Sequence, residues 1–331
     1  MDRYHYSAYG LSISVTHALP GLSLSLANSK QVDVEIHLSD QDRLPADFKT
    51  FSRGAWSSLS LLNPHPKSRF SLSHSLDEPL ISLSHPTGVE FIYTEDARTM
   101  WVIYHQFITL EYTAALLLNI GLAYNLQLRH FTCLHGSAVS INDQAVLFLG
   151  ESGMGKSTTA AFFAQHGHPV ITDDISALHE HDGRFWITPG YPSLRLFQSS
   201  FTPQLMEAQP TVRPIAPEWD KQYLALDDQQ FQFAHAPLAI SRIYLIAAWA
   251  ERAALTPLPT LEAMAWLNRY NYLYHLSEVD AHRRNFAFLA RLASMVPVVQ
   301  LTLPNQIAHL DQLYDAVISS QPSKSMTGNL Q

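Results

Sequence analysis

The segment GESGMGKST, residues 150–158, carries three glycines, a lysine and hydroxyl residues at the spacing of a phosphate-binding loop. Glycine permits backbone angles and close approaches that a side chain would block, so successive N–H groups can turn toward an anion. Lys156 is expected to reach the β- and γ-phosphates of a nucleotide, and the Ser157 hydroxyl to bind Mg²⁺. The residues predicted to bind the nucleotide are Gly150, Glu151, Ser152, Gly153, Met154, Gly155, Lys156, Ser157 and Thr158.

Two adjacent carboxylates, Asp173 and Asp174, follow the loop at the end of the apolar run PVIT. Metal-assisted phosphoryl transfer needs an acidic group near Mg²⁺ and a group that accepts the proton of the attacking hydroxyl. The two aspartates could divide these roles, although aspartates also end strands in ordinary turns. The sequence shows neither an NKxD nor an LSGGQ segment, which weakens the GTPase and transporter-ATPase interpretations.

The segments around these residues alternate between strand and helix patterns, which predicts an α/β layer architecture. Residues 133–141 and 144–150 read as strands joined by a turn at Asn142-Asp143, and 156–167 as a helix stopped by Gly167. The run 168–178 reads as one buried strand. Further strands are predicted at 184–190, 240–249 and 296–304, and amphipathic helices at 260–276 and 280–295.

The first part of the chain is predicted to be β-rich. Residues 11–20, 31–39 and 88–95 alternate apolar and polar side chains, and 57–88 reads as irregular loops around short strands. The apolar run 112–128 is short for a membrane span and contains Asn119, Asn125 and Gln127, so we predict a buried helix at 111–129. We place a domain boundary near residue 125, which gives domains 1–125 and 126–318 and a frayed tail, 319–331.

Composition sets weaker limits on function. A net charge of −8 and a pI of about 6.1 argue against a general binder of nucleic acid or anionic membranes. The single cysteine, Cys133, excludes an internal disulfide and suits a reducing cytosol, so we predict a cytoplasmic protein. The N-terminal MDRYHYSAYG is not expected to be a secretory signal. The histidine-rich runs HGH and LHEHDG lack zinc-site spacing and are expected on loops.

LHGSAV, GESGMGKS and HGHPVITDD stand in an order and spacing that resemble the HPr kinase/phosphorylase family, clearly from His135 to Leu178. The resemblance implies an α/β P-loop kinase domain of the HPr kinase/PEP carboxykinase-like type, a mixed sheet with flanking helices, after a β-rich α+β domain. It implies ATP and Mg²⁺ as cofactors. It also implies that Asp174 deprotonates an acceptor serine and that His135 supports the loop or the γ-phosphate. If the two carboxylates divide their roles, Asp173 is then the one that binds the metal.

Two features depart from the family's pattern. The family carries a glutamate downstream of its catalytic aspartate, whereas the corresponding run PGYPSLRLFQSS has no carboxylate and contains Arg195. The family's late arginine loop has two candidates here, Arg242 and Arg269. Lys221 is either structural or within reach of the phosphates. Arg195, Lys221, Arg242 and Arg269 are therefore the candidate substrate or phosphate contacts.

The chain also resembles a divergent group of HPr-kinase-like proteins found beside peptide-maturation genes of the lasso-peptide type. The resemblance rests on YSAYGLSI, VDVEIHL, LHGSAV, PGYPSLRLF and DKQYLAL. It implies that the acceptor is a serine of a ribosomal precursor peptide. The β-rich first domain would recognise this acceptor, because a sheet edge or groove can hold an extended peptide.

We therefore predict an ATP-dependent serine kinase whose acceptor is a protein or a precursor peptide. The alternatives are a nucleotide-binding regulatory module without transfer activity, a small-molecule kinase, and a phosphorylase that uses pyrophosphate. We predict no nucleic-acid partner and no membrane partner, and a homo-oligomer stays open.

Overall fold

The structure is a computed structural model that describes residues 3–20, 22, 31–40, 55–58, 70–208, 210–217, 219–227, 230–304 and 310–321. Two sequence predictions fall partly on other residues. The middle of the run 57–88 and most of the tail 319–331 lie outside the described residues.

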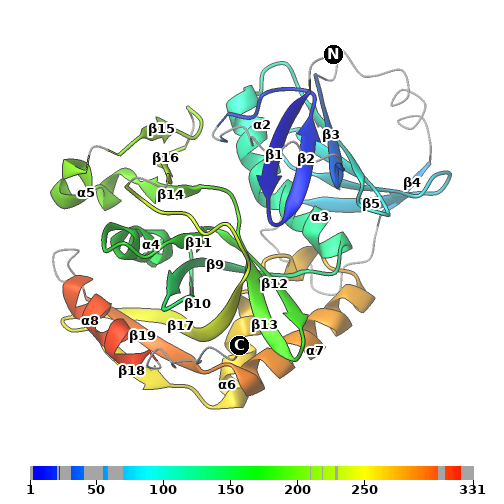
Figure 1. Cartoon of the computed structure of the whole chain (residues 1–331). Coiled ribbons are helices and arrows are strands. Elements are labelled where there is room, and N and C mark those ends of the chain that lie inside the picture. Colours follow the sequence, from blue (N-terminus) through cyan, green and yellow to red (C-terminus); the bar gives the residue numbers. More distant parts are fainter. Residues whose placement is uncertain are drawn as a thin grey trace, which may run out of the picture.

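The first part of the chain forms an eight-stranded sheet (Figure 1). Its spatial order is β1-β2-β3-β8-β7-β6-β5-β4, with parallel pairing only at β2–β3 and β3–β8 among the described strands. The strands predicted around 11–20, 31–39 and 88–95 are confirmed as β2, β3 and β7. The bounds are β1 Tyr4–Ala8, β2 Leu11–Val15, β3 Val34–Asp40, β4 Trp56–Ser58, β5 Ser71–Ser75, β6 Leu80–Ser84, β7 Glu90–Thr94 and β8 Thr99–Tyr104.

The predicted helix at 111–129 is confirmed as a buried element, but its middle is a π-helix. It comprises α2 (Leu110–Leu116), the π-helical η2 (Leu117–Gly121) and α3 (Leu122–Leu128). One apolar core runs from the first sheet through this element to the second half of the chain, since α3 also contacts β9 and β12. Within the described residues, no helix combines the length and the apolar character that crossing a membrane requires.

The second half is built on a mixed sheet of order β10-β9-β12-β13-β17-β19-β18, in which β10 also pairs with β17. β10–β17 and β17–β19 are parallel, so the carboxyl ends of these three strands share one edge. The bounds are β9 Thr132–Ile141, β10 Gln144–Gly150, β11 Val170–Thr172, β12 Ile175–His181, β13 Arg184–Thr188, β17 Leu238–Ala250, β18 Ala254–Pro257 and β19 Val298–Pro304.

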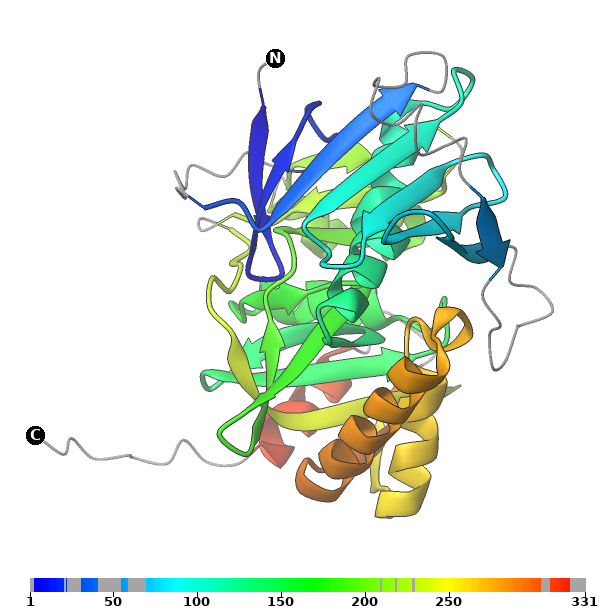
Figure 2. The same ribbon diagram turned by 90° about the vertical axis from the view of Figure 1, so that its right-hand side faces the viewer.

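Helices cover both faces of this sheet. Successive side chains of a strand point to opposite faces, and on β10 the side chains of both faces are apolar and buried. On β10, Val146 and Phe148 pack with α4 (Lys156–Gln165) and α8 (Leu310–Ser320), whereas Leu147 and Leu149 pack with α6 (Thr260–Arg269) and α7 (Val279–Met295). Figure 2 shows α6 and α7 side by side on their face. The mixed sheet with flanking helices that the sequence predicted is thus confirmed.

A third, antiparallel sheet of order β14-β16-β15 lies over α4, through contacts between α4 and β14 (Figure 1). It consists of β14 (Ser193–Phe197), β15 (Val212–Pro214) and β16 (Lys221–Ala225). The short helices η3 (Gln198–Ser200) and α5 (Pro203–Glu207) lie between β14 and β15 in the sequence. This sheet brings Arg195 and Lys221 toward the phosphate-binding loop.

Two predicted elements are wrong in their extent. The single strand expected at 168–178 is two strands, β11 and β12, separated at Asp173 and Asp174, where Asp174 adopts a φ of 70°. The helix expected at 260–276 ends at Arg269, because the next residues turn back and Asn271 forms a bridge with Leu134 of β9. A short 3₁₀ turn, η4 (Tyr274–Leu276), follows.

Candidate active site

The phosphate-binding loop joins the carboxyl end of β10 to the N-terminus of α4. Gly153 and Gly155 adopt φ values of 83° and 92°, which residues with a side chain reach only under strain. Gly150 has an ordinary φ, but a Cβ there would meet the Ile246 carbonyl oxygen at 3.0 Å. No side chain caps the N-terminus of α4, so its first-turn N–H groups have no capping acceptor. Such a helix N-terminus favours a bound anion.

The Lys156 side chain folds back onto the start of the phosphate-binding loop. Its side chain is buried, and its ammonium donates to the carbonyl oxygens of Gly150 at 2.8 Å and Glu151 at 3.0 Å. Burial lowers the pKa of Lys156 to about 8, although Asp174 and Asp173 act in the opposite direction. The lysine is therefore mostly charged at neutral pH, and an incoming phosphate would increase that charge further.

Asp173 and Ser157 bring together oxygen atoms of the kind that bind a metal ion. The Asp173 carboxylate accepts hydrogen bonds from the Ser157 hydroxyl at 2.8 Å, the Ser137 hydroxyl at 2.5 Å and the Arg195 backbone N–H at 2.8 Å. Magnesium prefers oxygen ligands and usually combines one or two carboxylates with phosphate oxygens and water. The two side chains thus fit Mg²⁺: Ser157 Oγ and Asp173 Oδ1 would hold it beside the loop.

Asp174 is held by three side chains from distant parts of the sequence. Its Oδ2 accepts from Asn119 Nδ2 and from Arg195 Nη1, both at 2.6 Å, and its Oδ1 lies 3.3 Å from His135 Nδ1. Burial raises the pKa of Asp174, but the Arg195 guanidinium, followed by His135 and two lysines, outweighs burial and leaves the pKa below its ordinary value. The carboxylate is consequently ionised at neutral pH.

His135 lies beside Asp174, and its contacts show which ring nitrogen carries the proton. Burial lowers the pKa of His135 despite the neighbouring carboxylate, so its ring is neutral at pH 7. Nδ1 faces the Asp174 carbonyl oxygen at 3.1 Å and its carboxylate at 3.3 Å. Both atoms are acceptors, which assigns the proton to Nδ1 and leaves Nε2 as an acceptor.

All of the predicted nucleotide-binding residues except Met154 line one of two adjoining cavities. The first, the phosphate cavity, has a volume of about 180 Å³ and is lined by Ser152, Gly153, Gly155, Lys156, Ser157 and Thr158, and also by Asp174 and Arg195. Gly150 and Glu151 line the second, larger cavity. Met154 lines neither, because its side chain packs against the core beneath α4 and its N–H bonds to the Glu151 carbonyl oxygen at 3.2 Å.

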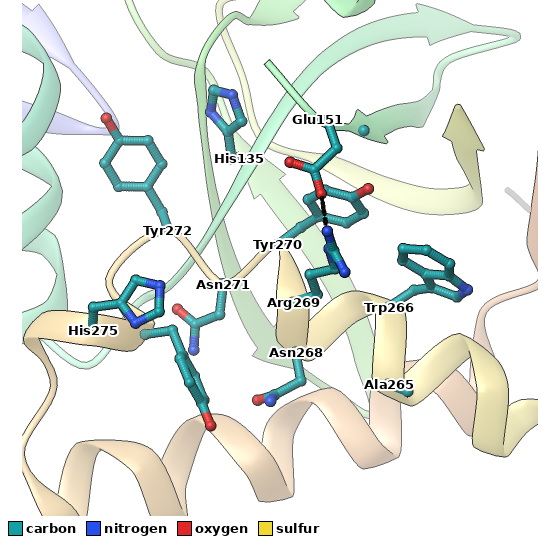
Figure 3. Close-up of a pocket in the computed structure, with 12 residues that line it drawn as sticks. His135, Glu151, Ala265, Trp266, Asn268, Arg269, Tyr270, Asn271, Tyr272 and His275 are labelled. Carbon is teal, nitrogen blue, oxygen red and sulfur yellow. Dashed lines mark hydrogen bonds and ion pairs between the residues drawn. The ribbon is translucent and has the colours of Figure 1, made fainter. Parts of the chain in front are cut away.

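The four candidate basic contacts have different positions. Arg195 and Lys221 line the phosphate cavity, and the Lys221 ammonium lies 4.8 Å from the centre of the Phe197 ring. Arg269 forms an exposed ion pair with Glu151 at 2.7 Å, at the larger cavity (Figure 3). Arg242 pairs with Val146 four residues before Gly150 on β10, roughly 13 Å along the strand from the loop. The structure therefore does not bring Arg242 to the site.

Sequence reasoning missed several side chains that complete the site. Asn119 appeared only as a polar interruption of an apolar run, yet its place in the π-helix directs it to Asp174, and π-turns often occur at functional sites. Ser137 lies in the quoted LHGSAV but was given no role. Phe197 and Trp249 line the phosphate cavity and are 39% and 41% exposed.

Comparison with known proteins confirms the resemblance to HPr kinase/phosphorylase. Residues 126–193 match the family model of the HPr Serine kinase C-terminal domain. The HPr kinase/phosphorylase of Clostridium perfringens strain SM101 is 23% identical over 188 residues, and that of Clostridium botulinum strain Alaska E43 is 27% identical over 188 residues. Each match covers 52% of this chain and 60% of the relative, so the chain spans less than two thirds of these proteins.

A solved structure, that of the Hpr(Ser) kinase/phosphatase from Coxiella burnetii, also matches. It is 10% identical and the match covers 56% of this chain and 87% of that chain, with a TM-score of 0.29. A TM-score of this size carries no argument about the fold or the site.

Proposed function

We propose that the protein is an ATP-dependent kinase that transfers the γ-phosphoryl group to a serine hydroxyl of a protein or ribosomal precursor peptide. The observation that carries this proposal is the convergence of the phosphate-binding loop with two aspartates in different surroundings. Asp173 contacts Ser157 at the helix N-terminus, whereas Asp174 contacts His135 and Arg195 and lines the phosphate cavity. In this proposal one carboxylate would bind the metal and the other would orient the acceptor hydroxyl.

The phosphate cavity would hold the triphosphate of ATP. The N–H groups at the start of α4 and the Lys156 ammonium would bind the phosphates, and Ser157 and Asp173 would hold Mg²⁺, which neutralises charge on the phosphate oxygens when bound. Lys221 adds a second cation at the cavity. The exposed rings of Phe197 and Trp249 offer surfaces against which the adenine base can stack.

Asp174 would orient the acceptor hydroxyl and take its proton. Because its pKa is low, the carboxylate is ionised and ready to accept a hydrogen bond from the serine at neutral pH. A low pKa also makes it a weak base, which fits a loose phosphoryl transition state in which the hydroxyl keeps its proton until late. The positioning of the hydroxyl would then supply more of the rate than proton removal does.

The identity of the acceptor rests on resemblance. The named relatives are HPr kinase/phosphorylases, which supports a protein acceptor. The resemblance of YSAYGLSI and PGYPSLRLF to proteins of lasso-peptide-type gene clusters supports the proposal of a ribosomal precursor peptide instead. We further propose a cytoplasmic location, and a homo-oligomer stays open.

The division at about residue 125, with the first part recognising the acceptor, remains a proposal. One contact supports a closer role of the segment before the boundary in the chemistry. Asn119 reaches Asp174 across 55 positions of sequence, so η2 supplies one of the hydrogen bonds that hold the candidate catalytic carboxylate. The shared apolar core means that the two parts are best studied in the intact chain.

A regulatory module that binds ATP without transfer is the second candidate. Arg195 favours it, because this arginine occupies the run in which the family carries a glutamate and is paired with Asp174 at 2.6 Å. Incubation of the intact chain with Mg·ATP and a serine peptide, read by mass spectrometry for added phosphate, separates the two. Phosphopeptide that is absent with the Asp174→Asn variant supports the kinase; bound ATP without phosphopeptide supports the module.

A further inference from the structure

The larger cavity next to the phosphate-binding loop has a volume of about 820 Å³. Its walls come from the end of α6, from the segment 270–275 and from the first residues of the loop, and four of its lining side chains are aromatic: Trp266, Tyr270, Tyr272 and Tyr274 (Figure 3). Pockets of 300–1,000 Å³ with apolar walls and a few polar groups are typical ligand sites. The size and lining of the cavity therefore fit a ligand as large as a peptide segment of several residues.

The backbone ties this cavity to the predicted catalytic histidine. His135 N–H donates to the Tyr270 carbonyl oxygen, and Tyr272 N–H donates to the Cys133 carbonyl oxygen, both at 2.8 Å. These bonds and the Leu134–Asn271 bridge make the segment 270–272 a partner of β9. His135 lines both cavities, so the two cavities adjoin at this side chain.

The direction of phosphoryl transfer decides which substrate this cavity faces. The attacking oxygen must approach in line, opposite the leaving β-phosphate oxygen. The β-phosphate would lie at Lys156 and Ser157, on the α4 side of the loop. The larger cavity is lined by Gly150 and Glu151, at the start of the loop, and by His135, which makes it the candidate entrance for the attacking group. The adenine of ATP does not need the larger cavity, because it can stack on Phe197 and Trp249 in the phosphate cavity.

One buried polar group indicates what the ligand presents. Asn271 is 5% exposed, lines the larger cavity, and its Nδ2 finds no hydrogen-bond partner among the described residues. The Asn271 Oδ1 accepts a hydrogen bond from the Leu273 N–H at 3.4 Å. This contact identifies which end of the amide group is the oxygen and leaves Nδ2 as the end without a partner. A buried donor without a partner is costly, and a carbonyl oxygen of a ligand would satisfy it.

We propose that the larger cavity binds the acceptor segment of a peptide or protein, with Asn271 Nδ2 donating to a backbone carbonyl oxygen and an aromatic or large apolar side chain next to the acceptor serine packing on Trp266 and Tyr270. The centres of these two rings lie 6.1 Å apart with an angle of 11° between their planes, and the Arg269 guanidinium lies 5.5 Å from the centre of the Trp266 ring. This inference rests on the proposed kinase function and names the part of the chain that chooses the acceptor.

The test uses an oriented library of decapeptides with one fixed serine, incubated with the intact protein and Mg·ATP. We expect enrichment of Phe, Tyr, Trp or Leu beside the phosphorylated serine. For the best peptide, Asn271→Asp keeps the acceptor for Leu273 N–H but replaces the donor by a carboxylate oxygen. We expect it to raise the peptide KM about tenfold or more and to leave the KM for ATP within twofold. Trp266→Ala should weaken the preference for aromatic residues.

Asn285→Asp is the matched control. Asn285 is 7% exposed, and its Oδ1 also accepts a single hydrogen bond, from the Thr132 hydroxyl at 3.0 Å, but it lies on α7 outside this cavity. The inference is overturned if both variants change the peptide KM equally, if neither changes it, or if Asn271→Asp raises the KM for ATP instead. If ATP binds but no library peptide is phosphorylated by the wild type, the proposed peptide-kinase function itself fails.

Discussion

Replacing Arg195 by Met tests how the site holds its ionised aspartate. The Arg195 side chain is 2% exposed, and its Nη1 lies 2.6 Å from Asp174 Oδ2. Met retains most of the volume of the side chain but removes the charge. The variant leaves the Asp174 carboxylate buried, with Asn119 and a neutral His135 as its contacting side chains and Lys221 and Lys156 as the remaining nearby cations.

The expected cost is large because one partner of a buried ion pair is removed while the other stays. Such changes destabilise proteins by about 3–5 kcal/mol. The remaining hydrogen bond from Asn119 places the expectation at the lower end, about 3 kcal/mol, which corresponds to a fall of roughly 1 M in the urea midpoint for a slope of about 3 kcal/mol/M. Arg213→Met, an exposed arginine on β15, should change stability by less than about 0.5 kcal/mol.

The pH dependence of this loss follows from the pKa of Asp174. In the wild type the folded-state pKa is depressed, so the ionised carboxylate contributes stability above its ordinary pKa, and that contribution is lost as the pH falls through the folded value. Arg195→Met removes the largest charge that opposes burial, so we expect the pKa of Asp174 to rise above its ordinary value; the carboxyl would then favour folding at low pH and oppose it as the pH rises. The difference between the two proteins should therefore shrink from pH 7 toward about pH 4.

Urea unfolding at several pH values measures these differences, with the double variant Arg195→Met/Asp174→Asn as the decisive partner. Without an uncompensated charge, the double variant should recover most of the lost stability. A loss below about 1 kcal/mol in Arg195→Met, or the same loss in the double variant, would refute the argument that the guanidinium compensates a buried carboxylate.

Three further outcomes follow from the site. Lys156→Ala should weaken ATP binding at least tenfold in calorimetry and abolish transfer, because it removes the cation that reaches the β- and γ-phosphates; wild-type turnover would show that the loop has another role. Asp173→Asn should raise the Mg²⁺ concentration needed for half-maximal rate, whereas Asp174→Asn should keep ATP binding and lose transfer; equal loss of ATP binding in both would show that they act together on the metal. Asn119→Leu should lower kcat about tenfold and leave the KM for ATP unchanged, because it frees one side of the Asp174 carboxylate; an unchanged kcat in a folded variant would limit Asn119 to packing.

Local sequence signals predicted the elements around the loop well. Asn142 and Asp143 adopt φ values of 53° and 61°, which a two-residue hairpin turn requires and which these residue types tolerate. Gly167, with a φ of 81°, follows the end of α4 where the sequence placed a stop. The alternation of strand and helix patterns likewise indicated the layered second half, since these signals depend on neighbours only a few residues apart.

The site's details depended on contacts that no local pattern contains. The strand at 168–178 breaks because Asp173 and Asp174 are bound by side chains from η2, β9 and β14. The helix at 260–276 ends early because the residues after Arg269 pair with β9. Arg242 could not be separated from Arg269 by sequence, because its distance from the loop depends on the register of β17 against β10.

Transfer of the terminal phosphate of ATP is the central claim, and the most direct measurement follows that phosphate with a radioactive label. The intact protein is incubated with Mg²⁺, ATP labelled at the γ-phosphate and the serine decapeptide library, and the acid hydrolysate is separated for phosphoserine. We predict labelled phosphoserine with the wild type and none above background with Asp174→Asn, which should still bind ATP. Equal phosphoserine with both proteins, or none with a wild type that binds ATP, would contradict the claim.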